Sequence, residues 1–290
     1  MKRLATALAS AALIGTPAFA ADMGVPSAPP AAPVYNWTGW YVGVNAGASF
    51  GNVKTDFNVA PVTVTVVSGP PISVPGLANS DRVYPDGFMG GGQIGYNWQF
   101  SPIWVVGLEA DIQGALEKDS STFSTPFHFS YLPFPTDPTL KLPVTGSAVA
   151  AYSAQIDWFG TVRLRAGYVW GNGTVFSYVT GGLAYGEVKT DGITTLTGTV
   201  TGNTFSISHA IGHSHVNTGW TVGYGTEGVI DFWGSRNWTW KIESLYVDLG
   251  HLDDNDAIVV TPVSVSGGQV TTHSHFTDGI LRAGLNYKFY

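Results

Sequence analysis

The sequence contains no cysteine, few charged residues and no long apolar run beyond its first twenty residues. Without cysteine, no disulfide can stabilise the chain. Charged residues make up 11% of the sequence, against about 25% in typical soluble domains. No later apolar run approaches about 18 residues, which excludes a helical inner-membrane protein. The abundant residues are glycine, with 37 copies, and the aromatics, which make up 13% and include 10 tryptophans.

The N-terminus has the three parts of a secretory signal peptide within residues 1–20. Lys2 and Arg3 form the positive region, an apolar run follows, and residues 18–20 (AFA) fit a cleavage site. Residues 21–37 are rich in proline and alanine, which predicts an extended periplasmic spacer. Removal of the signal leaves 11 basic against 20 acidic residues, a net charge of −9. An acidic chain is not expected to bind nucleic acid.

The clearest structural pattern lies in residues 152–170 (YSAQIDWFGTVRLRAGYVW). Every second residue from Ile156 is uncharged, whereas the alternate residues include an aspartate and two arginines. Because successive strand side chains point to opposite faces, this is a strand with one apolar and one charged face. Its length, and the aromatic Trp170 at its end, are typical of a strand that crosses a bilayer. Val162 is then predicted to face lipid and Thr161 the lumen, so that arginine should be better tolerated at Thr161.

Seven further stretches show the same alternation. The predicted strands are residues 38–50, 88–100, 103–116, 152–170, 174–186, 220–230, 238–249 and 281–289. Three connections are short (101–102, 171–173 and 233–237) and alternate with four long ones, which is the rule for outer-membrane barrels. The predicted fold class is all-β: an eight-stranded antiparallel up-and-down transmembrane β-barrel over residues 38–290, with both termini at the short-turn end. Val/Thr alternation in the first, third and fourth long loops predicts projecting hairpins.

Six stretches together resemble one known family. They are YNWTGWYVGVNAG (35–47), GTVRLRAGYVW (160–170), YVTGGLAYG (178–186), TGWTVGYGTE (218–227), KIESLYVDLG (241–250) and LRAGLNYKF (281–289). Over nearly the whole chain after the signal, the sequence is similar to the small OmpA-like outer-membrane β-barrels of alphaproteobacteria, the outer-membrane immunogenic or porin family. Such barrels usually finish on an aromatic residue that the assembly machinery reads, whereas here Phe289 keeps the alternation and Tyr290 is additional.

The resemblance implies a place in the outer membrane of a Gram-negative bacterium. Termini are expected in the periplasm and long loops outside. The expected partners are outer-membrane lipid, lipopolysaccharide and, during biogenesis, the barrel-assembly machinery. The chain is expected to stop at the barrel, without a peptidoglycan-binding domain. The sequence leaves its oligomeric state open.

The inward-facing positions predict a lumen lined with charge. The residues are Glu109, Asp111, Asp157, Arg163, Arg165, Glu227, Lys241, Glu243, Arg282 and Lys288. An eight-stranded barrel is only wide enough for its own side chains, and buried charges must be paired. We therefore predict an ion-pair network and a structural, surface-exposed role in envelope integrity. The alternative is a porin-like conduit for small solutes, lined by charged rings.

Histidines near the third and fourth long loops are candidate metal ligands. They are His213, His215, His251, His273 and His275, with His209 nearby. Converging imidazoles can bind zinc or copper. However, strand parity places the first two inward and the last two outward, and the sequence supplies no coordination distances. Solvated loop histidines are the preferred interpretation, and no metal or cofactor is predicted.

The two His-Ser-His triplets, residues 213–215 and 273–275, also raise the possibility of a lipid-modifying enzyme at the rim. Serine and histidine adjacent on a strand point to opposite faces and do not form a nucleophile–base pair unaided. No Gly-x-Ser-x-Gly elbow, phosphate loop or paired-carboxylate motif is present. We therefore predict no catalytic residue and no enzymatic activity.

Overall fold

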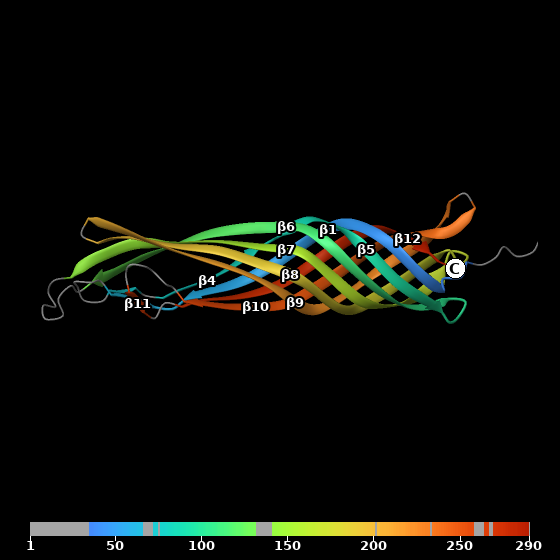
Figure 1. The fold of residues 1–290 in the computed structure, drawn as a ribbon, viewed down its shortest axis with the longest axis horizontal. Coiled ribbons are helices and arrows are strands. Elements are labelled where there is room, and N and C mark those ends of the chain that lie inside the picture. The colour runs from blue at the N-terminus through green and yellow to red at the C-terminus, as the bar shows by residue number, and fades with distance from the viewer. Residues whose placement is uncertain are drawn as a thin grey trace, which may run out of the picture. The chain divides into compact units, whose positions relative to one another are not determined.

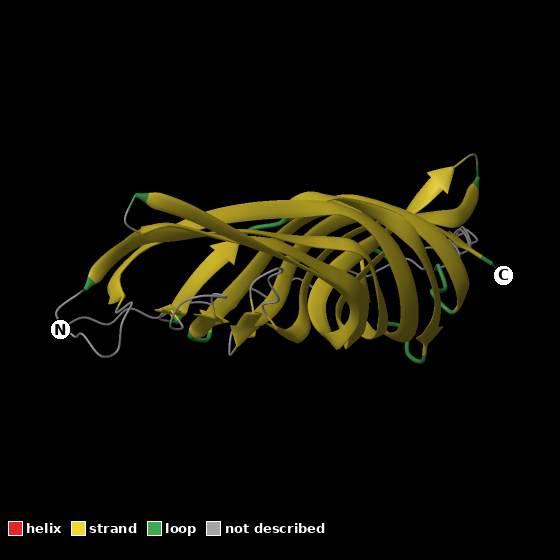
Figure 2. Ribbon diagram, turned by 60° about the vertical axis from the view of Figure 1, so that its left-hand side comes forward, coloured by secondary structure: helices red, strands yellow, loops and turns green. Residues whose placement is uncertain are grey.

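The structure is a computed structural model that describes residues 35–65, 72–74, 76–131, 141–200, 202–232, 234–257, 264–266 and 269–289. The expected signal peptide and residues 21–34 of the expected spacer lie outside these ranges. Within them the regular elements are all strands (Figure 2). No helix in the described ranges has the length and apolarity to span a bilayer. The strands are β1 (Gly39–Val59), β2 (Val62–Thr65), β3 (Ile72–Val74), β4 (Leu77–Val83), β5 (Asp86–Gln99), β6 (Trp104–Tyr131), β7 (Leu142–Trp170), β8 (Val175–Val200), β9 (Asn203–Phe232), β10 (Ser235–Ala257), β11 (Ser264–Ser266) and β12 (Gln269–Lys288).

Eight strands close into an antiparallel ring (Figure 1). Their order is β1-β5-β6-β7-β8-β9-β10-β12, and β12 pairs back to β1 from Tyr41↔Lys288 to Val59↔Val270. β4 continues the line of β5 along β1, and Pro85 lies at the break between them, where its missing N–H cannot join the ladder. β2, β3 and β11 form a separate small sheet. The eight-stranded up-and-down barrel predicted from the sequence is confirmed.

Three short turns lie at one end of the ring, which we call the turn end; the opposite end is the hairpin end. Two of them span residues 100–103 and 171–174, and the third connects Phe232 to Ser235. In the second turn Gly171, Asn172 and Gly173 all have positive φ, at 62°, 57° and 86°. Glycine and asparagine tolerate this left-handed region best. The short connection predicted at residues 171–173 is therefore confirmed.

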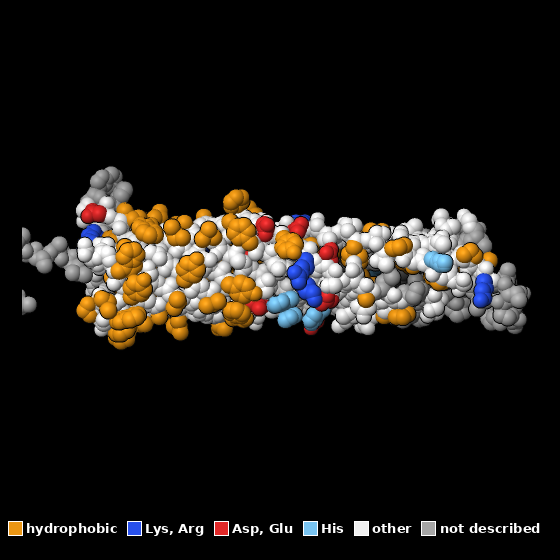
Figure 3. Space-filling view, turned by 180° about the vertical axis from the view of Figure 1, so that it is seen from behind, with side chains coloured by type: hydrophobic (Ala, Val, Ile, Leu, Met, Phe, Trp, Pro, Cys, Tyr) orange, Lys and Arg blue, Asp and Glu red, His pale blue; other side chains and the backbone are white. Residues whose placement is uncertain are grey.

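An apolar belt surrounds the outside of the ring near the turn end (Figure 3). Its exposed side chains include Trp40, Val44, Phe50, Ile94, Trp98, Leu108, Val162, Leu164, Leu183, Tyr224, Ile242 and Leu285. The charged residues between them on the same strands are buried inside the ring. This arrangement inverts that of a soluble protein and matches a strand surface solvated by lipid.

One strand departs from the predicted alternation. The pairing of β7 with β8 runs Ile156↔Val188 and then Trp158↔Glu187, so Asp157 forms a β-bulge. One extra residue moves all side chains before it to the opposite face. Ile156, predicted to point outward, is therefore buried inside the barrel. Asp157, predicted to line the lumen, instead lies outside, where its carboxylate binds Lys189 Nζ at 2.5 Å.

Beyond the belt, the strands run further than predicted. β6 extends to Tyr131 and β7 begins at Leu142, so most of residues 117–150, predicted as a proline-rich loop, forms a hairpin. β8 and β9 form a second long hairpin, as the Val/Thr alternation predicted for the third loop. The second loop was missed because its prolines outweighed the serine–phenylalanine alternation of residues 120–130. Pro126 is accommodated because it lies on a strand with an open edge.

The ring opens above the belt along two seams. The pairing of β9 with β10 ends at Trp220↔Asp248, and that of β5 with β6 ends at Met89↔Ala115. Two four-stranded sheets continue from there: β6-β7-β8-β9 and β10-β12-β1-β4. Polar contacts still bridge the seams, including the Tyr84 N–H, which donates to Asp119 Oδ2 at 2.8 Å.

The belt yields a first prediction. We expect Val162→Arg to destabilise the barrel by about 2–4 kcal/mol, because residue 162 lies on β7 within the apolar belt, where the arginine side chain would face lipid. Folding into lipid vesicles, followed by tryptophan fluorescence, measures the loss. Ile193→Arg is the matched control, since Ile193 is exposed on the hairpin beyond the belt. Equal losses for the two variants would contradict the lipid-facing assignment.

The structure places Thr161 in the lumen, as predicted, but it changes the effect that we expect of Thr161→Arg. Thr161 is fully buried, and its hydroxyl oxygen accepts a hydrogen bond from Arg163 Nε at 2.8 Å. A second guanidinium at this position would enter a filled interior beside an existing one. We therefore expect Thr161→Arg to destabilise the barrel as well, through overpacking and an unpaired buried charge.

Candidate functional site

The middle of the lumen holds eight charged side chains, which we call the charge network. Its members are Glu109 and Asp111 of β6, Arg163 and Arg165 of β7, Glu227 of β9, Lys241 and Glu243 of β10, and Arg282 of β12. All are buried, and none is more than 4% exposed. Four carboxylates face four cations, so the network has no formal net charge. The inward parity of the five strands places these side chains at one level of the barrel.

Glu109 is the hub of the charge network. Its carboxylate accepts hydrogen bonds from Arg163 Nη2 at 2.5 Å, Arg165 Nη1 at 3.0 Å and Lys241 Nζ at 2.9 Å. The hydroxyl of Tyr41 adds a fourth donor at 2.7 Å. One carboxylate thus links three cations from two strands, so removing its charge would leave all three without their shared partner.

Glu243 is the second hub. It accepts from Arg163 Nη1 at 2.9 Å and from Arg282 Nη2 at 2.6 Å, while Arg282 Nη2 also donates to Asp111 at 2.8 Å. Arg163 therefore bridges both hubs. Taking an ion out of water costs several kcal/mol unless it is paired and hydrogen-bonded. The dense pairing is what allows eight charges to be buried inside one barrel.

An aromatic plug closes the lumen between the charge network and the turn end. Trp37 is 1% exposed and packs against Phe176, with ring centroids 5.4 Å apart. Its backbone N–H donates to Gln99 Oε1 at 2.9 Å, and its indole N–H donates to the Gly173 carbonyl at 3.1 Å. Tyr35 packs edge-on against the indole. The segment before β1 is thereby fixed to the turn between β7 and β8.

Arg165 joins this plug to the charge network. Its guanidinium lies 4.0 Å from the ring centroid of Tyr178 and 5.4 Å from that of Phe176. Guanidinium groups stack favourably on aromatic faces. The same group binds Glu227 Oε2 at 2.6 Å. Aromatic and ionic layers are therefore in direct contact.

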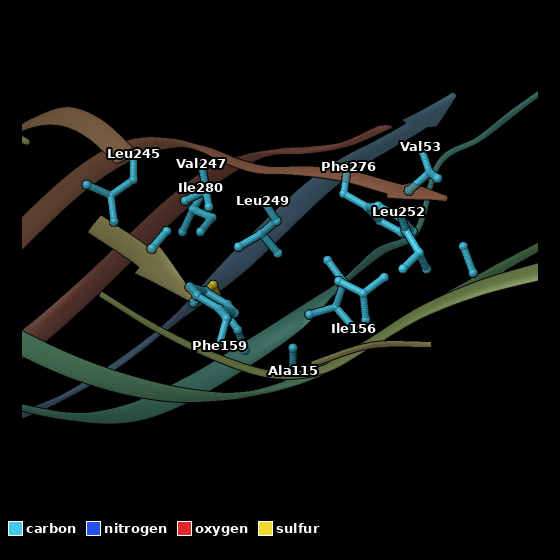
Figure 4. Close-up of a cluster of buried hydrophobic side chains, with 14 of the residues drawn as sticks. Val53, Ala115, Ile156, Phe159, Leu245, Val247, Leu249, Leu252, Phe276 and Ile280 are labelled. Atoms are coloured by element: carbon cyan, nitrogen blue, oxygen red, sulfur yellow. The ribbon is translucent and has the colours of Figure 1, made fainter. Parts of the chain in front are cut away.

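An apolar core fills the lumen on the other side of the charge network, toward the hairpin end (Figure 4). The figure shows side chains from several strands pointing toward one another across the interior. They include Val53, Ile156, Phe159, Leu245, Val247, Leu249, Leu252, Phe276 and Ile280. Above this core, the Tyr152 hydroxyl lies 3.3 Å from Ser274 Oγ, which lies 3.0 Å from Thr55 Oγ1. The closed part of the ring is thus filled by the aromatic plug, the charge network and the apolar core.

Of the ten residues predicted to line the lumen as one network, the structure brings eight together. Asp157 lies outside the barrel because of the bulge described above. Lys288 faces inward but is directed to the turn end, where its ammonium donates to the Asn36 carbonyl and lies 4.8 Å from the centroid of Tyr35. It lies too close to the end of β12 to reach the hubs. These two placements correct the prediction.

The five histidines do not form one site. His213 and His215 lie on the inner face of β9, and His213 Nδ1 lies 3.6 Å from Asp254 across the seam. His251, His273 and His275 point outward from β10 and β12, where His251 and His275 stack with centroids 4.3 Å apart. Asp248 and Asp253 bind His275 and His273. Among the residues that the structure describes, no group of three or more histidine, cysteine or acidic side chains could hold a metal ion.

The serines of the two triplets have other partners. Ser214 Oγ donates to Glu187 Oε1 at 2.6 Å on the outer surface. Ser274 Oγ is buried with Thr55 and Tyr152. Their neighbouring histidines lie on the opposite faces of β9 and β12, as strand parity predicted. Within the described residues neither hydroxyl has a histidine partner that would make it a nucleophile.

A band of charge borders the apolar belt on its hairpin side, and Figure 3 shows acidic, basic and histidine side chains gathered there. Lys189 lies between Asp157, at 2.5 Å, and Glu187, at 3.7 Å. The hydrogen bond from Lys189 lowers the pKa of Asp157, and the same bond raises the pKa of Lys189. The hydrogen bond from Ser214 lowers the pKa of Glu187. These groups stay charged at the level where a lipid head group would lie.

Sequence reasoning missed the aromatic plug and the apolar core. Tyr35 and Trp37 were assigned to the spacer, yet they have the same odd parity as Tyr41, the first inward residue recognised in β1. That continuity was a usable signal. The apolar core had a weaker one: in residues 245–249 (LYVDL) both faces contain apolar residues, which is typical of a strand buried on one side and lipid-exposed on the other.

Comparison with known proteins places this geometry in context. The model of the outer membrane protein beta-barrel domain family matches residues 6–289. The 31 kDa outer-membrane immunogenic proteins of Brucella melitensis and Brucella suis are each 35% identical over 295 residues, which cover 96% of this chain and 96% of theirs.

Among solved structures, the crystal structure of Ail, the attachment invasion locus protein of Yersinia pestis, is 13% identical with a TM-score of 0.26, covering 83% of this chain and 99% of Ail. Neisserial surface protein A is 11% identical with a TM-score of 0.27, covering 82% of this chain and 97% of that protein.

Proposed function

Because the chain belongs to the outer membrane protein β-barrel family, we propose that it is a closed structural barrel that maintains the envelope and presents its hairpins at the cell surface. The protein is located in the bacterial outer membrane. The name of its Brucella relatives, outer-membrane immunogenic protein, supports an antigenic surface. Termini at the turn end then face the periplasm, and the two long hairpins face outside.

The filled lumen is the observation that carries this proposal. A conduit needs a continuous polar path, with binding sites that ions can enter and leave. Here Trp37 and Phe176 close one side of the charge network, and Phe159 and Ile280 lie in the apolar core on the other side. Each arginine of the network is engaged by carboxylates at hydrogen-bond distance. This arrangement favours a stabilising network over a porin-like channel.

Planar-bilayer recording of the purified protein tests the closed lumen. We expect no steady conductance, because an ion would have to displace the aromatic plug, the charge network and the apolar core together. Arg163→Gln and Arg165→Gln provide the comparison. A steady conductance in the unmodified protein that changes on neutralising either arginine would establish the porin-like alternative and overturn the closed-barrel proposal.

Outer-membrane lipid is the proposed partner of the outer surface. The apolar belt meets hydrocarbon, and lysines beyond it on β1, β6 and β8 (Lys54, Lys118 and Lys189) lie where anionic head groups of lipopolysaccharide would be. Ion pairs near a surface are weak singly and act as a set. The barrel-assembly machinery is the proposed partner during insertion, reading the final strand with Phe289 in register. The serines of the two triplets have structural partners, Glu187 for Ser214 and Thr55 for Ser274, which supports a role without catalysis.

A further inference from the structure

The projecting sheets leave one long strand edge that is different from the others. Residues Asn203–Gly219 of β9 pair with β8 on one side. On the other side, no described strand pairs with them, since β10 joins β9 only from Trp220 onward. Contacts with β10 still cross the seam at His213 and Asn217, so the open part of this edge is Asn203–Gly212. Every second residue of an antiparallel strand turns its N–H and C=O away from its partner, so this part offers about five residues for further hydrogen bonding.

The other three edges above the belt contain residues that block strand addition. These residues are Asp81 and Arg82 in β4, Lys118, Asp119 and Pro126 in β6, and Asp253, Asp254 and Asp256 in β10. Charged side chains and proline on an edge are how sheets avoid pairing with other chains. Residues 203–219 (NTFSISHAIGHSHVNTG) contain no lysine, arginine, aspartate, glutamate or proline. Of these four edges, as far as the structure describes them, only the β9 edge lacks this protection.

Side chains along the β9 edge also suit an added strand. The outward row (Thr204, Ser206, Ser208 and Ala210) is small and exposed. The alternate row includes Ile207 and His209, which are half-buried. An added strand would place small polar side chains beside the first row and β-branched apolar ones beside the second, since side chains of paired strands align on each face.

We propose that the β9 edge binds an extended, uncharged peptide segment of another protein as an additional strand. Main-chain hydrogen bonds provide the affinity, and the two side-chain rows select alternating small polar and β-branched residues. This goes beyond the envelope role. The strand-binding proposal does not depend on a closed lumen, so a conductance in the bilayer recording would not contradict it. Only the source of the partner, outside the cell, depends on the proposed orientation.

Fluorescence anisotropy with a labelled peptide tests the proposal. The probe is a peptide of alternating threonine and valine, about ten residues long to match Asn203–Gly212. The full-length barrel is held in lipid nanodiscs. We expect saturable binding, and about tenfold weaker binding of the same peptide with one central residue replaced by proline, which removes a donor from the ladder. This comparison leaves the protein unchanged, so it does not depend on the folding of any variant.

A matched pair of protein variants locates the binding. Ser206→Lys with Ser208→Lys places charge on the β9 edge and should weaken peptide binding about tenfold or more. Ser124→Lys with Ser130→Lys makes the same exposed changes on the outward row of β6 and should leave binding unchanged. Circular dichroism checks that both variants keep the barrel.

Three results would overturn the proposal. The first is no saturable binding to the unmodified barrel. The second is equal binding by the β9 and β6 variants. The third is a dimer, seen by analytical ultracentrifugation, that the β9 variant dissolves and that excludes the peptide, because the edge would then belong to a second copy of this chain.

Discussion

Replacing Glu109 with glutamine is expected to lower the free energy of unfolding by about 3–5 kcal/mol, the cost of leaving buried charges without their partner. The substitution keeps the shape of the side chain and removes its charge. Arg163, Arg165 and Lys241 would then share the remaining carboxylates, and the charge network would gain one net positive charge. Urea unfolding in detergent micelles, followed by tryptophan fluorescence, measures the change.

Asp157→Asn is the control for this prediction. Asp157 also binds a lysine at 2.5 Å, but the pair lies on the outer surface with both side chains about a third exposed. Exposed pairs contribute about 0–1 kcal/mol. Adding Lys241→Met to Glu109→Gln should restore part of the stability by returning the network to neutrality. A loss for Glu109→Gln no larger than that for Asp157→Asn would show that the network does not hold the barrel together.

Trp37→Ala is the second large prediction. The indole is almost fully buried, and truncating a buried tryptophan costs about 3–5 kcal/mol because a cavity replaces its contacts. Here the cavity would open at the turn end, beside Phe176. The same urea titration measures the loss, and faster hydrogen exchange at the Gly171–Thr174 turn should accompany it, because the turn loses the donor to the Gly173 carbonyl.

Trp40→Ala is the matched control, three residues further along the chain. Trp40 is 58% exposed on the apolar belt, where lipid can replace the lost ring. Its truncation should therefore cost clearly less. Trp37→Phe should cost about 1 kcal/mol, close to one hydrogen bond, because it retains most of the packing. Equal losses for Trp37→Ala and Trp40→Ala would mean that the plug does not contribute to stability.

The alternation of apolar and polar residues was sufficient to predict the barrel, because one face of each strand meets lipid and the other meets the charged lumen. In β12, for example, Leu281 and Leu285 face outward and Arg282 and Asn286 inward, as expected. The ends of the strands were not predictable in the same way. Beyond the belt, neither face meets lipid, so the contrast between faces fades and residues 117–131 resemble a loop.

Two β-bulges explain why the alternation of apolar and polar residues did not predict the facing of every side chain. A bulge adds one residue to one strand only. Nothing in the local composition marks the bulge at Asp157, whereas the bulge at Leu249 is followed by Gly250, whose φ of 78° is one that glycine adopts readily. The effect of a bulge is to exchange inside and outside for every residue beyond it. Ile156 and Asp157 were consequently assigned to the wrong faces. Strand parity predicts which charged side chains point into the lumen. It does not predict which of them form ion pairs, because that depends on how far each side chain reaches across the lumen.

The pairing of β1 with β12 has a consequence for biogenesis. β1 can pair early with β5, but it gains its second neighbour only when the twenty residues of β12 (Gln269–Lys288) arrive. Such distant contacts are slow to form, because the intervening chain must be ordered first. A truncated product would have two unpaired strand edges. Their backbone N–H and C=O groups would lie in hydrocarbon without hydrogen-bond partners, which is energetically unfavourable. The ring can therefore close only after the whole of β12 is available.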